Sequence, residues 1–149
     1  MNRDKIKKRA ISNRVKIDRD KCISCLGCMS ACIVSHDGKS PRNRVVISAK
    51  KASSPIFCQR CNLPECTYTC MSGALFIDSA TGYVLYDSEQ CAGCNMCVMA
   101  CPYGVLKPDK VDDKIAKCDM CVNHANKTPQ CVARCPMQAV TLEEGGTDL

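Results

Sequence analysis

The sequence predicts a small α+β fold with little regular structure, in which bound metal replaces much of the usual hydrophobic core. Three observations support this class. Sixteen of the 149 residues are cysteine. A pattern of short strand, cysteine loop and helical turn repeats along the chain. Apolar residues other than cysteine make up only about 35% of the chain, below the roughly 45–50% of ordinary globular chains, so a side-chain core alone is thin for this length.

The cysteines form four groups of four, and none is left over. Groups one and three have the spacing C-x2-C-x2-C-x3-C, which is typical of chains that hold cubane iron–sulfur clusters. Groups two and four have an insertion between their second and third cysteines but still end C-x3-C. Sixteen thiolates suffice for four [4Fe–4S] clusters, so the sequence predicts an electron conductor whose folding is coupled to cluster insertion. In chain order the groups are Cys22, Cys25, Cys28 and Cys32; Cys58, Cys61, Cys66 and Cys70; Cys91, Cys94, Cys97 and Cys101; and Cys118, Cys121, Cys131 and Cys135.

Both insertions contain a proline two residues before the third cysteine. These prolines are Pro64 in group two and Pro129 in group four. Because proline fixes its own φ, we expect each inserted segment to re-enter the cysteine loop through a fixed turn.

Short strands are expected before groups one and three, where apolar and polar residues alternate. These runs are residues 15–17 and 83–86, and a period of two is typical of strands. Residues 75–77 and 83–85 flank the segment 78–82, which ends in glycine, and therefore predict a β-hairpin.

Short helical turns are expected at residues 24–31 and 93–100, where they would carry the third and fourth cysteines of groups one and three. Pro102 and Pro136 directly follow the last cysteines of groups three and four. They would stop the helices there, since proline cannot continue a helix.

Two polar segments lie between the groups. Residues 35–51 are polar and basic around one strand candidate at 45–47, which indicates a surface insertion. Residues 107–117 are charged, and we expect them to link group three to group four.

The net charge of +6 is concentrated in a basic N-terminal arm. Residues 1–16 carry seven lysines or arginines and one aspartate, while the rest of the chain is balanced. Four clusters with their thiolates would add roughly −8, so we expect a basic arm on an anionic body and no nucleic-acid partner. The run Lys7–Arg9 is open to two interpretations, a docking arm or a solvated end.

No apolar run is long enough for a signal peptide or a membrane span, and the residues after 142 are few and acidic. We therefore expect a cytoplasmic protein with no membrane contact. Its cysteines should be reduced thiols rather than a disulfide framework, which belongs to secreted chains.

Zinc is the main alternative ligand for paired cysteines. Zinc sites normally use two separated pairs, whereas three cysteines at i, i+3 and i+6 with a fourth at i+10 suit one tetrahedral ion poorly, and this array occurs twice. His36 and His124 could replace a cysteine ligand, but no cysteine needs replacing. We therefore expect them to be polar surface histidines.

The methionines beside the cysteines are expected to pack over the clusters as soft apolar cover. They are Met29, Met71, Met96, Met99, Met120 and Met137. The sequence contains no nucleophile–base pair, phosphate loop or nucleotide fingerprint, so it predicts no catalytic site of its own.

The order and spacing of the four groups resemble the four-cluster electron-transfer subunits of the DMSO-reductase and formate-dehydrogenase beta type. The resemblance covers about residues 15–142. It rests on the motifs Cys22-Ile-Ser-Cys-Leu-Gly-Cys28, Cys58-Gln-Arg-Cys-Asn-Leu-Pro-Glu-Cys66, Cys91-Ala-Gly-Cys-Asn-Met-Cys97 and Lys117-Cys-Asp-Met-Cys121.

The resemblance implies that groups one and four pair with each other, as do groups two and three, so that each fourth cysteine serves the partner group's cluster. It implies an inner ferredoxin-like module (about 52–109) inserted in an outer one (15–51 and 110–142), between a basic arm (1–14) and an acidic tail (143–149). The implied ligand sets are Cys22, Cys25, Cys28 and Cys135; Cys118, Cys121, Cys131 and Cys32; Cys58, Cys61, Cys66 and Cys101; and Cys91, Cys94, Cys97 and Cys70.

In function, the resemblance implies a relay of single electrons between a large catalytic oxidoreductase subunit and another carrier, such as a ferredoxin or a flavoprotein, in anaerobic metabolism. Small members of the family serve tungsten aldehyde oxidoreductases, carbon monoxide dehydrogenases, formate dehydrogenases and hydrogenases. A free diffusible polyferredoxin and a zinc-stabilised adaptor are the alternatives. Met71 departs from the family pattern, which has proline there, and leaves the turn after Cys70 open.

Overall fold

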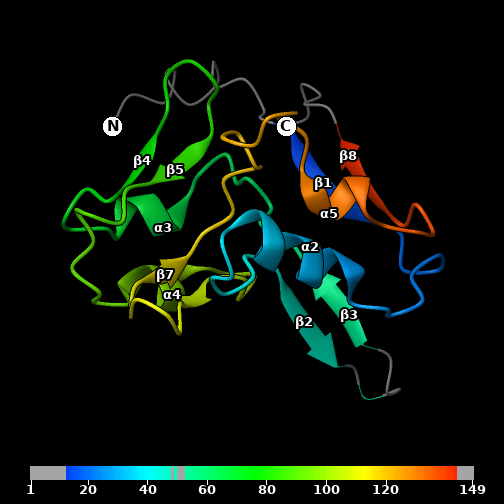
Figure 1. Cartoon of the computed structure of the whole chain (residues 1–149). Helices are drawn as coiled ribbons and strands as arrows, with labels where there is room; N and C mark the ends of the chain where they lie inside the picture. Colours follow the sequence, from blue (N-terminus) through cyan, green and yellow to red (C-terminus); the bar gives the residue numbers. More distant parts are fainter. Residues whose placement is uncertain (1–12, 48, 50–52, 144–149) are drawn as a thin grey trace.

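The computed structural model describes residues 13–47, 49 and 53–143, and within them all helices and strands are short (Figure 1). In chain order these elements are β1 (Arg14–Ile17), α2 (Gly27–Ser35), β2 (Arg44–Ile47), β3 (Ser53–Ile56), α3 (Glu65–Tyr68), β4 (Leu75–Ile77), β5 (Val84–Tyr86), α4 (Met96–Ala100), β6 (Lys107–Pro108), β7 (Ile115–Ala116), α5 (Gln130–Ala133) and β8 (Val140–Glu143).

The strands of the described residues form four two-stranded antiparallel ribbons. β1 pairs with β8, so that Val15 lies opposite Leu142 and the two ends of the described chain are held together. β2 pairs with β3, β4 with β5, and β6 with β7. An isolated two-stranded ribbon is at best marginally stable, so each ribbon depends on what packs against it.

Two separate hydrophobic clusters take the place of a single core. The first lies where β1 and β8 meet α2 and α5, and the second lies among β4, β5, β7 and α4. α2 packs against α5, and α3 packs against α4. Figure 1 shows the two groups of elements side by side. The buried members are Val15, Cys28, Phe57, Met120 and Val140 in the first cluster, and Leu75, Val84, Cys97, Leu106 and Ile115 in the second.

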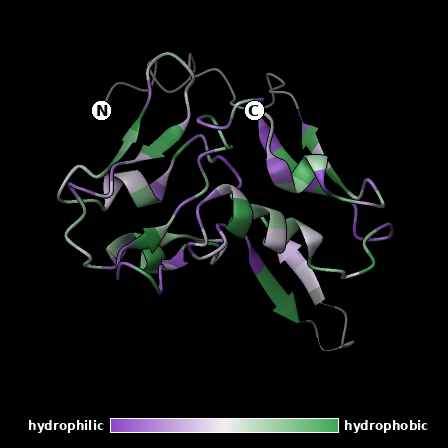
Figure 2. Ribbon diagram, in the orientation of Figure 1, coloured by the Kyte–Doolittle hydropathy of each residue, from purple (hydrophilic) through white to green (hydrophobic). Residues whose placement is uncertain are grey.

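The β2–β3 ribbon projects from the group that contains β1, β8, α2 and α5 (Figure 1). β2 is strongly hydrophobic in Figure 2, yet Val46 and Ile47 are exposed. The ribbon contains the strand expected at residues 45–47 and lies on the surface, as expected of an insertion.

The other local elements largely follow the sequence pattern. The expected hairpin is β4–β5, and the strand expected before group one is β1. The helix of group one is longer than expected because α2 continues to Ser35, whereas the helix of group three begins only at Met96.

Residues 107–117 link group three to group four as expected, but they are more than a charged connection. The segment folds into the β6–β7 hairpin, and Ile115, Ala116 and Lys117 at its end are buried. The apolar pair Ile115 and Ala116 follows the charged residues of the turn and is buried. The burial of Ile115 in the second cluster holds the segment in place.

Two residues pack across the expected module boundaries: Phe57 belongs to the first cluster and Ile115 to the second. The basic run Lys7–Arg9 and the residues after Glu143 lie outside the described residues. In the described parts of the chain, no helix has the length and apolar character needed to cross a bilayer.

Candidate iron–sulfur centres

Four cavities each bring together a set of four cysteines, three from one group and the last cysteine of another, and Cys58 also reaches the wall of a second cavity. We name each cavity by the first cysteine of the three. The Cys22 cavity is lined by Cys22, Cys25, Cys28 and Cys135; the Cys118 cavity by Cys118, Cys121, Cys131 and Cys32; the Cys58 cavity by Cys58, Cys61, Cys66 and Cys101; and the Cys91 cavity by Cys91, Cys94, Cys97 and Cys70. All sixteen cysteines thus line a cavity, and none is in a disulfide.

The Cys58 and Cys118 cavities are neighbours. Cys58 lines both of them, and Lys117, which lines the Cys58 cavity, directly precedes Cys118 in the chain. We call these two the middle cavities and the Cys22 and Cys91 cavities the end cavities.

The four cysteine loops share a backbone conformation, although their sequences differ at the position concerned. The residue before the second cysteine has a positive φ in every group: 57° at Ser24, 54° at Arg60, 70° at Gly93 and 58° at Met120. Positive φ is unfavourable for residues other than glycine. Its occurrence in all four loops therefore shows that the arrangement of the cysteines, and not local preference, sets the backbone.

The third cysteine of every group is the second residue of a short helix: Cys28 in α2, Cys66 in α3, Cys97 in α4 and Cys131 in α5. In the groups with insertions, the N-caps of these helices are the two prolines noted in the sequence. In the regular groups they are Leu26 and Asn95, both in the left-handed conformation.

In groups one, two and four, the Sγ of the fourth cysteine accepts hydrogen bonds from backbone N–H groups. Arg42 N donates to Cys32 Sγ at 3.2 Å, and Leu75 N donates to Cys70 Sγ at 3.4 Å. Burial alone would raise the pKa of these thiols, but hydrogen bonds outweigh it, and the pKa values of Cys32, Cys70 and Cys135 are lowered. These residues are therefore prepared to act as thiolate ligands.

The thiols on the helices behave in the opposite way. Burial, reinforced by neighbouring thiols, raises the pKa of Cys97 to about 11 and also raises the pKa of Cys28 and Cys131. Several thiolates in one small cavity repel one another, and a bound metal cation removes that cost. The donor set, thiols only, fits an iron–sulfur cluster.

A buried arginine gives a second indication of an anionic ligand. Arg60 is 4% exposed and lines the Cys58 cavity. Its Nη1 donates to Val84 O at 3.4 Å, and its guanidinium lies 4.5 Å from the centre of the Tyr83 ring. Its Nε and Nη2 have no hydrogen-bond partner among the described residues. Since a buried unpaired charge is costly, this side chain fits a cavity that holds an anionic cluster.

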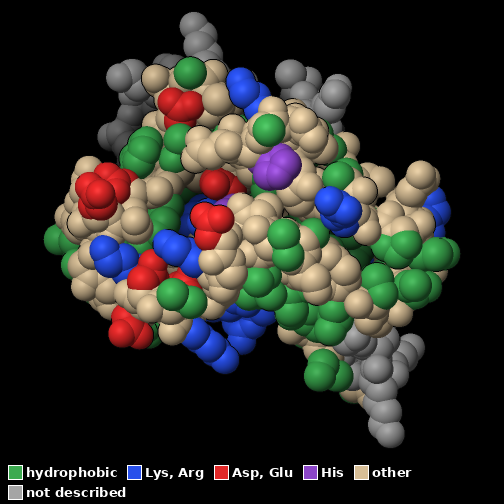
Figure 3. All heavy atoms as spheres, in the orientation of Figure 1, with side chains coloured by type: hydrophobic (Ala, Val, Ile, Leu, Met, Phe, Trp, Pro, Cys, Tyr) green, Lys and Arg blue, Asp and Glu red, His purple; other side chains and the backbone are tan. Residues whose placement is uncertain are grey.

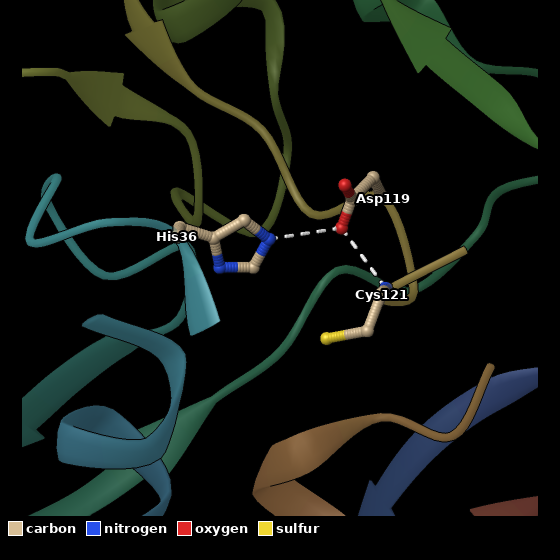
Figure 4. A group of neighbouring side chains, drawn as sticks. All are labelled: His36, Asp119 and Cys121. Atoms are coloured by element: carbon tan, nitrogen blue, oxygen red, sulfur yellow. Dashed lines mark hydrogen bonds and ion pairs between the residues drawn. The ribbon is translucent and has the colours of Figure 1, made fainter. Parts of the chain in front are cut away.

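His36 bridges two segments beside the Cys118 cavity (Figure 4). Its Nε2 donates to Asp119 Oδ1 at 3.2 Å and its Nδ1 donates to Cys32 O at 2.8 Å, while Asp119 Oδ1 accepts the Cys121 N–H at 2.9 Å. Chiefly because of Asp119, the pKa of His36 is raised to about 10. The expectation of a surface histidine is wrong here: the His36 side chain is 10% exposed because it joins α2 to the loop of group four.

His36, Asp119 and Cys121 are also close enough to bind one metal ion, since one potential ligand atom from each lies within 4.8 Å of the others. Cys121 already lines the Cys118 cavity, however, and the Asp119 carboxylate is already hydrogen-bonded. The three residues therefore orient a cysteine loop and do not constitute a separate metal site.

The expected methionine cover is confirmed at two positions and wrong at three. Met120 lines the Cys118 cavity and Met137 lines the Cys22 cavity. Met71, Met96 and Met99 are 92%, 49% and 82% exposed and line none of the four cavities. A methionine that is next to a cysteine in the sequence need not point into the same cavity, because the loop turns sharply at each cysteine.

Comparison with known proteins agrees with the chemistry of the cavities. Residues 49–145 match the family model described as a 4Fe-4S dicluster domain. The electron transport protein HydN of Escherichia coli (strain K12) is 34% identical over a gapped alignment of 151 positions, which covers 83% of each chain. An iron-sulfur protein of Rhodospirillum rubrum is 33% identical over a gapped alignment of 150 positions, which covers 83% of this chain and 77% of that protein.

A longer relative contains only a region of this kind. UacF of Escherichia coli (strain K12) is 35% identical over 131 residues, which cover 82% of this chain but 20% of UacF. The family match and the two relatives of similar length lead to one conclusion: the chain belongs to the 4Fe-4S dicluster domain family.

Proposed function

We propose that the chain is an electron-transfer subunit that holds four [4Fe–4S] clusters, one in each cavity, and relays single electrons between a catalytic oxidoreductase subunit and another redox carrier. The observation that carries this proposal is that each of four cavities brings three cysteines of one group together with the last cysteine of its partner group. Bound clusters of this kind accept and release one electron at a time.

The ligand sets we propose are the four sets of cysteines that line the cavities. Each set combines three cysteines of one group with the last cysteine of its partner group, which is the cross-ligation found in two-cluster ferredoxins. The packing of α2 on α5 and of α3 on α4 supports the same pairing of groups. We accordingly propose two modules, centred on the two hydrophobic clusters, with Phe57 in the outer module and Ile115 in the inner one.

We further propose that the cavities form a row in the order Cys22, Cys118, Cys58, Cys91. Each pair of packed helices joins one end cavity to one middle cavity. Cys58 joins the two middle cavities. A row of this kind has two ends, so electrons can enter at one and leave at the other.

The ends of the row are the places where partners would exchange electrons. Cys25 in one end cavity and Cys94 in the other are the two cysteines classed as exposed. Ile23 and Leu26, which flank Cys25, are exposed and apolar. Figure 3 shows hydrophobic side chains gathered at the right-hand edge of the molecule, on the side where the loop before α2 lies in Figure 1.

For partners, we propose what the family resemblance implies: a large catalytic subunit of the aldehyde oxidoreductase, carbon monoxide dehydrogenase, formate dehydrogenase or hydrogenase type, with a ferredoxin or flavoprotein as the other carrier. The name of the relative HydN describes electron transport, and the match to a fifth of UacF indicates that such a region also occurs within a larger protein. We propose no catalytic site within this chain itself.

Anaerobic purification from the native source tests the proposal, with iron and sulfide quantified and every co-purifying chain identified. About sixteen irons per chain and a co-purifying metalloenzyme are expected. Zinc in place of iron would overturn electron transfer in favour of a zinc-stabilised adaptor.

A freely diffusing polyferredoxin is the second candidate, and the exposure of cysteines at both ends of the row favours it. Full iron content without any stable partner would support this candidate over the subunit. Deletion of residues 1–14 sharpens the distinction: if the truncated chain still co-purifies with its partner in the same ratio, the basic arm is not the docking element.

A further inference from the structure

A buried lysine lies between the two middle cavities. Lys117 is 1% exposed. Its Nζ donates to Cys58 Sγ at 3.4 Å and to Cys118 O at 3.0 Å. It therefore contacts a cysteine of one cavity and the backbone of the first cysteine of the next. Arg42 Nη1 donates to Lys117 O at 2.8 Å and helps to fix the backbone of this residue.

Arg60 adds a second buried cation on the wall of the same cavity. Among the described residues, no carboxylate forms an ion pair with Lys117 or Arg60. Both side chains line the Cys58 cavity, and the Lys117 ammonium is in direct contact with the Cys58 sulfur.

Two buried cations without carboxylate partners need a negative charge nearby, because an uncompensated buried charge strongly destabilises a protein. The Cys58 thiolate, whose Sγ lies 3.4 Å from Lys117 Nζ, and whatever the middle cavities bind can carry that charge. The cations also feel little solvent screening, so their field on both cavities is strong.

We propose, on the basis of the proposed function, that Lys117 with Arg60 acts as a fixed positive charge that raises the reduction potential of the clusters in the middle cavities, most of all in the Cys58 cavity. Reduction adds one electron and thus one negative charge to a cluster. A nearby cation stabilises the reduced form more than the oxidised form, so electrons are held in the centre of the row.

The test compares the iron-loaded full chain with four variants, one of them Arg60→Met, in redox titrations monitored by electron paramagnetic resonance. Lys117→Met removes the charge and keeps the length of the side chain, whereas Lys117→Arg keeps the charge. Lys110→Met is the matched control, because Lys110 is exposed in the turn between β6 and β7. Iron and sulfide are measured for every sample before titration.

In Lys117→Met, the equilibrium constant for reducing at least one cluster should fall about tenfold, which lowers its potential by about 59 mV for one electron. Lys117→Arg and Lys110→Met should titrate like the wild type. Arg60→Met should lower the same potential, since Arg60 and Lys117 both line the Cys58 cavity.

The outcomes separate this inference from the proposed function. A wild-type chain without iron overturns the proposed function. Fully loaded Lys117→Met with unchanged potentials overturns the charge effect, and an equal fall in Lys117→Arg overturns it in favour of packing. If Lys117→Met loses iron while Lys117→Arg keeps it with wild-type potentials, the positive charge at this position is required and the inference stands. If both variants lose iron, the shape of the lysine side chain is required and the inference fails.

Discussion

The end cavities and the middle cavities are built from the same kind of loop but have different surroundings. Each end cavity takes three cysteines from a regularly spaced group, and each middle cavity takes three from a group with an insertion. The end cavities have an exposed cysteine, Cys25 or Cys94, whereas the middle cavities have the buried cations Arg60 and Lys117 beside them. The spacing of a group thus corresponds to its place in the molecule.

The difference does not arise at the second and third cysteines, although the helix N-caps differ between the two kinds of group. All four loops have a positive φ before the second cysteine and the third cysteine at the second position of a helix. It arises in what covers them: the buried prolines Pro64 and Pro129 belong to the insertions of the middle groups. An insertion therefore adds material that closes a cavity without changing how its cysteines are presented.

The largest expected effect comes from changing a cysteine that crosses between groups. Cys135→Ser should remove about four of sixteen irons by damaging the site in the Cys22 cavity, since that is the cavity Cys135 lines. Iron analysis and electron paramagnetic resonance at low temperature measure the loss. Cys131→Ser is the matched variant, because it should damage the Cys118 cavity instead. Identical spectra for the two variants would contradict the pairing of groups one and four.

The next largest effect should be a difference in the rate of cluster loss. With a chelator and a trace of oxidant, about half of the iron should leave several times faster than the rest, because only the end cavities have an exposed cysteine. Iron release and resonance signals are followed together over time. A single phase in which all signals decay at one rate would show that exposure does not distinguish ends from middle.

A smaller effect is expected from the His36–Asp119 pair at the Cys118 cavity. His36→Gln should lower the free energy of unfolding by about 1.5–3 kcal/mol at pH 6, the usual range for a hydrogen bond to a charged group. The pKa of His36 is raised from 6.5 to about 10. Its contribution is therefore complete below pH 6.5 and is lost as the pH rises through 10.

The measurement is anaerobic denaturant unfolding of wild type and variant between pH 6 and 10, and the difference between them should shrink as the pH rises. His124→Gln is the control, because the described contact of His124 is to Gln130 and not to a carboxylate. A difference that stays constant across this range would mean that His36 acts through packing alone.

These regions also show what sequence can and cannot predict. The cysteine spacing alone indicated iron–sulfur chemistry, and alternation of apolar residues located β1 and the β4–β5 hairpin. The buried Lys117 could not be found this way, because it follows a run of charged residues typical of a surface linker. Its proximity to Cys58 depends on tertiary packing between segments 59 residues apart.

The shared positive φ was also hidden, since Ser24, Arg60 and Met120 have no common local preference for it. The residue types at this position differ, so the shared conformation follows from where the cysteine sulfurs must lie. Those positions are known only from the folded chain, in which the cysteine groups meet. Gly93 was the one visible sign, because glycine adopts this conformation at little cost.

The smallest expected effects compare two glycines in the loops of the end cavities. Gly93 has φ +70°, and a Cβ there would lie 3.5 Å from Asp113 O, an ordinary contact. Gly93→Ala should therefore destabilise the chain by roughly 1 kcal/mol through backbone strain alone. Ser24 occupies the equivalent place in group one with φ 57°, so the loop tolerates a side chain there.

Gly27→Ala should have the opposite sign. Gly27 begins α2, and a Cβ there would make only ordinary contacts, the nearest at 3.5 Å to Cys25 Sγ. Met96 fills the equivalent position in α4, and alanine favours a helix over glycine by roughly 0.5–1 kcal/mol. Denaturant unfolding of both variants at matched iron content measures the difference. Destabilisation by Gly27→Ala would break the equivalence of the two end loops, because it would mean that the Cys22 cavity needs space that the Cys91 cavity does not.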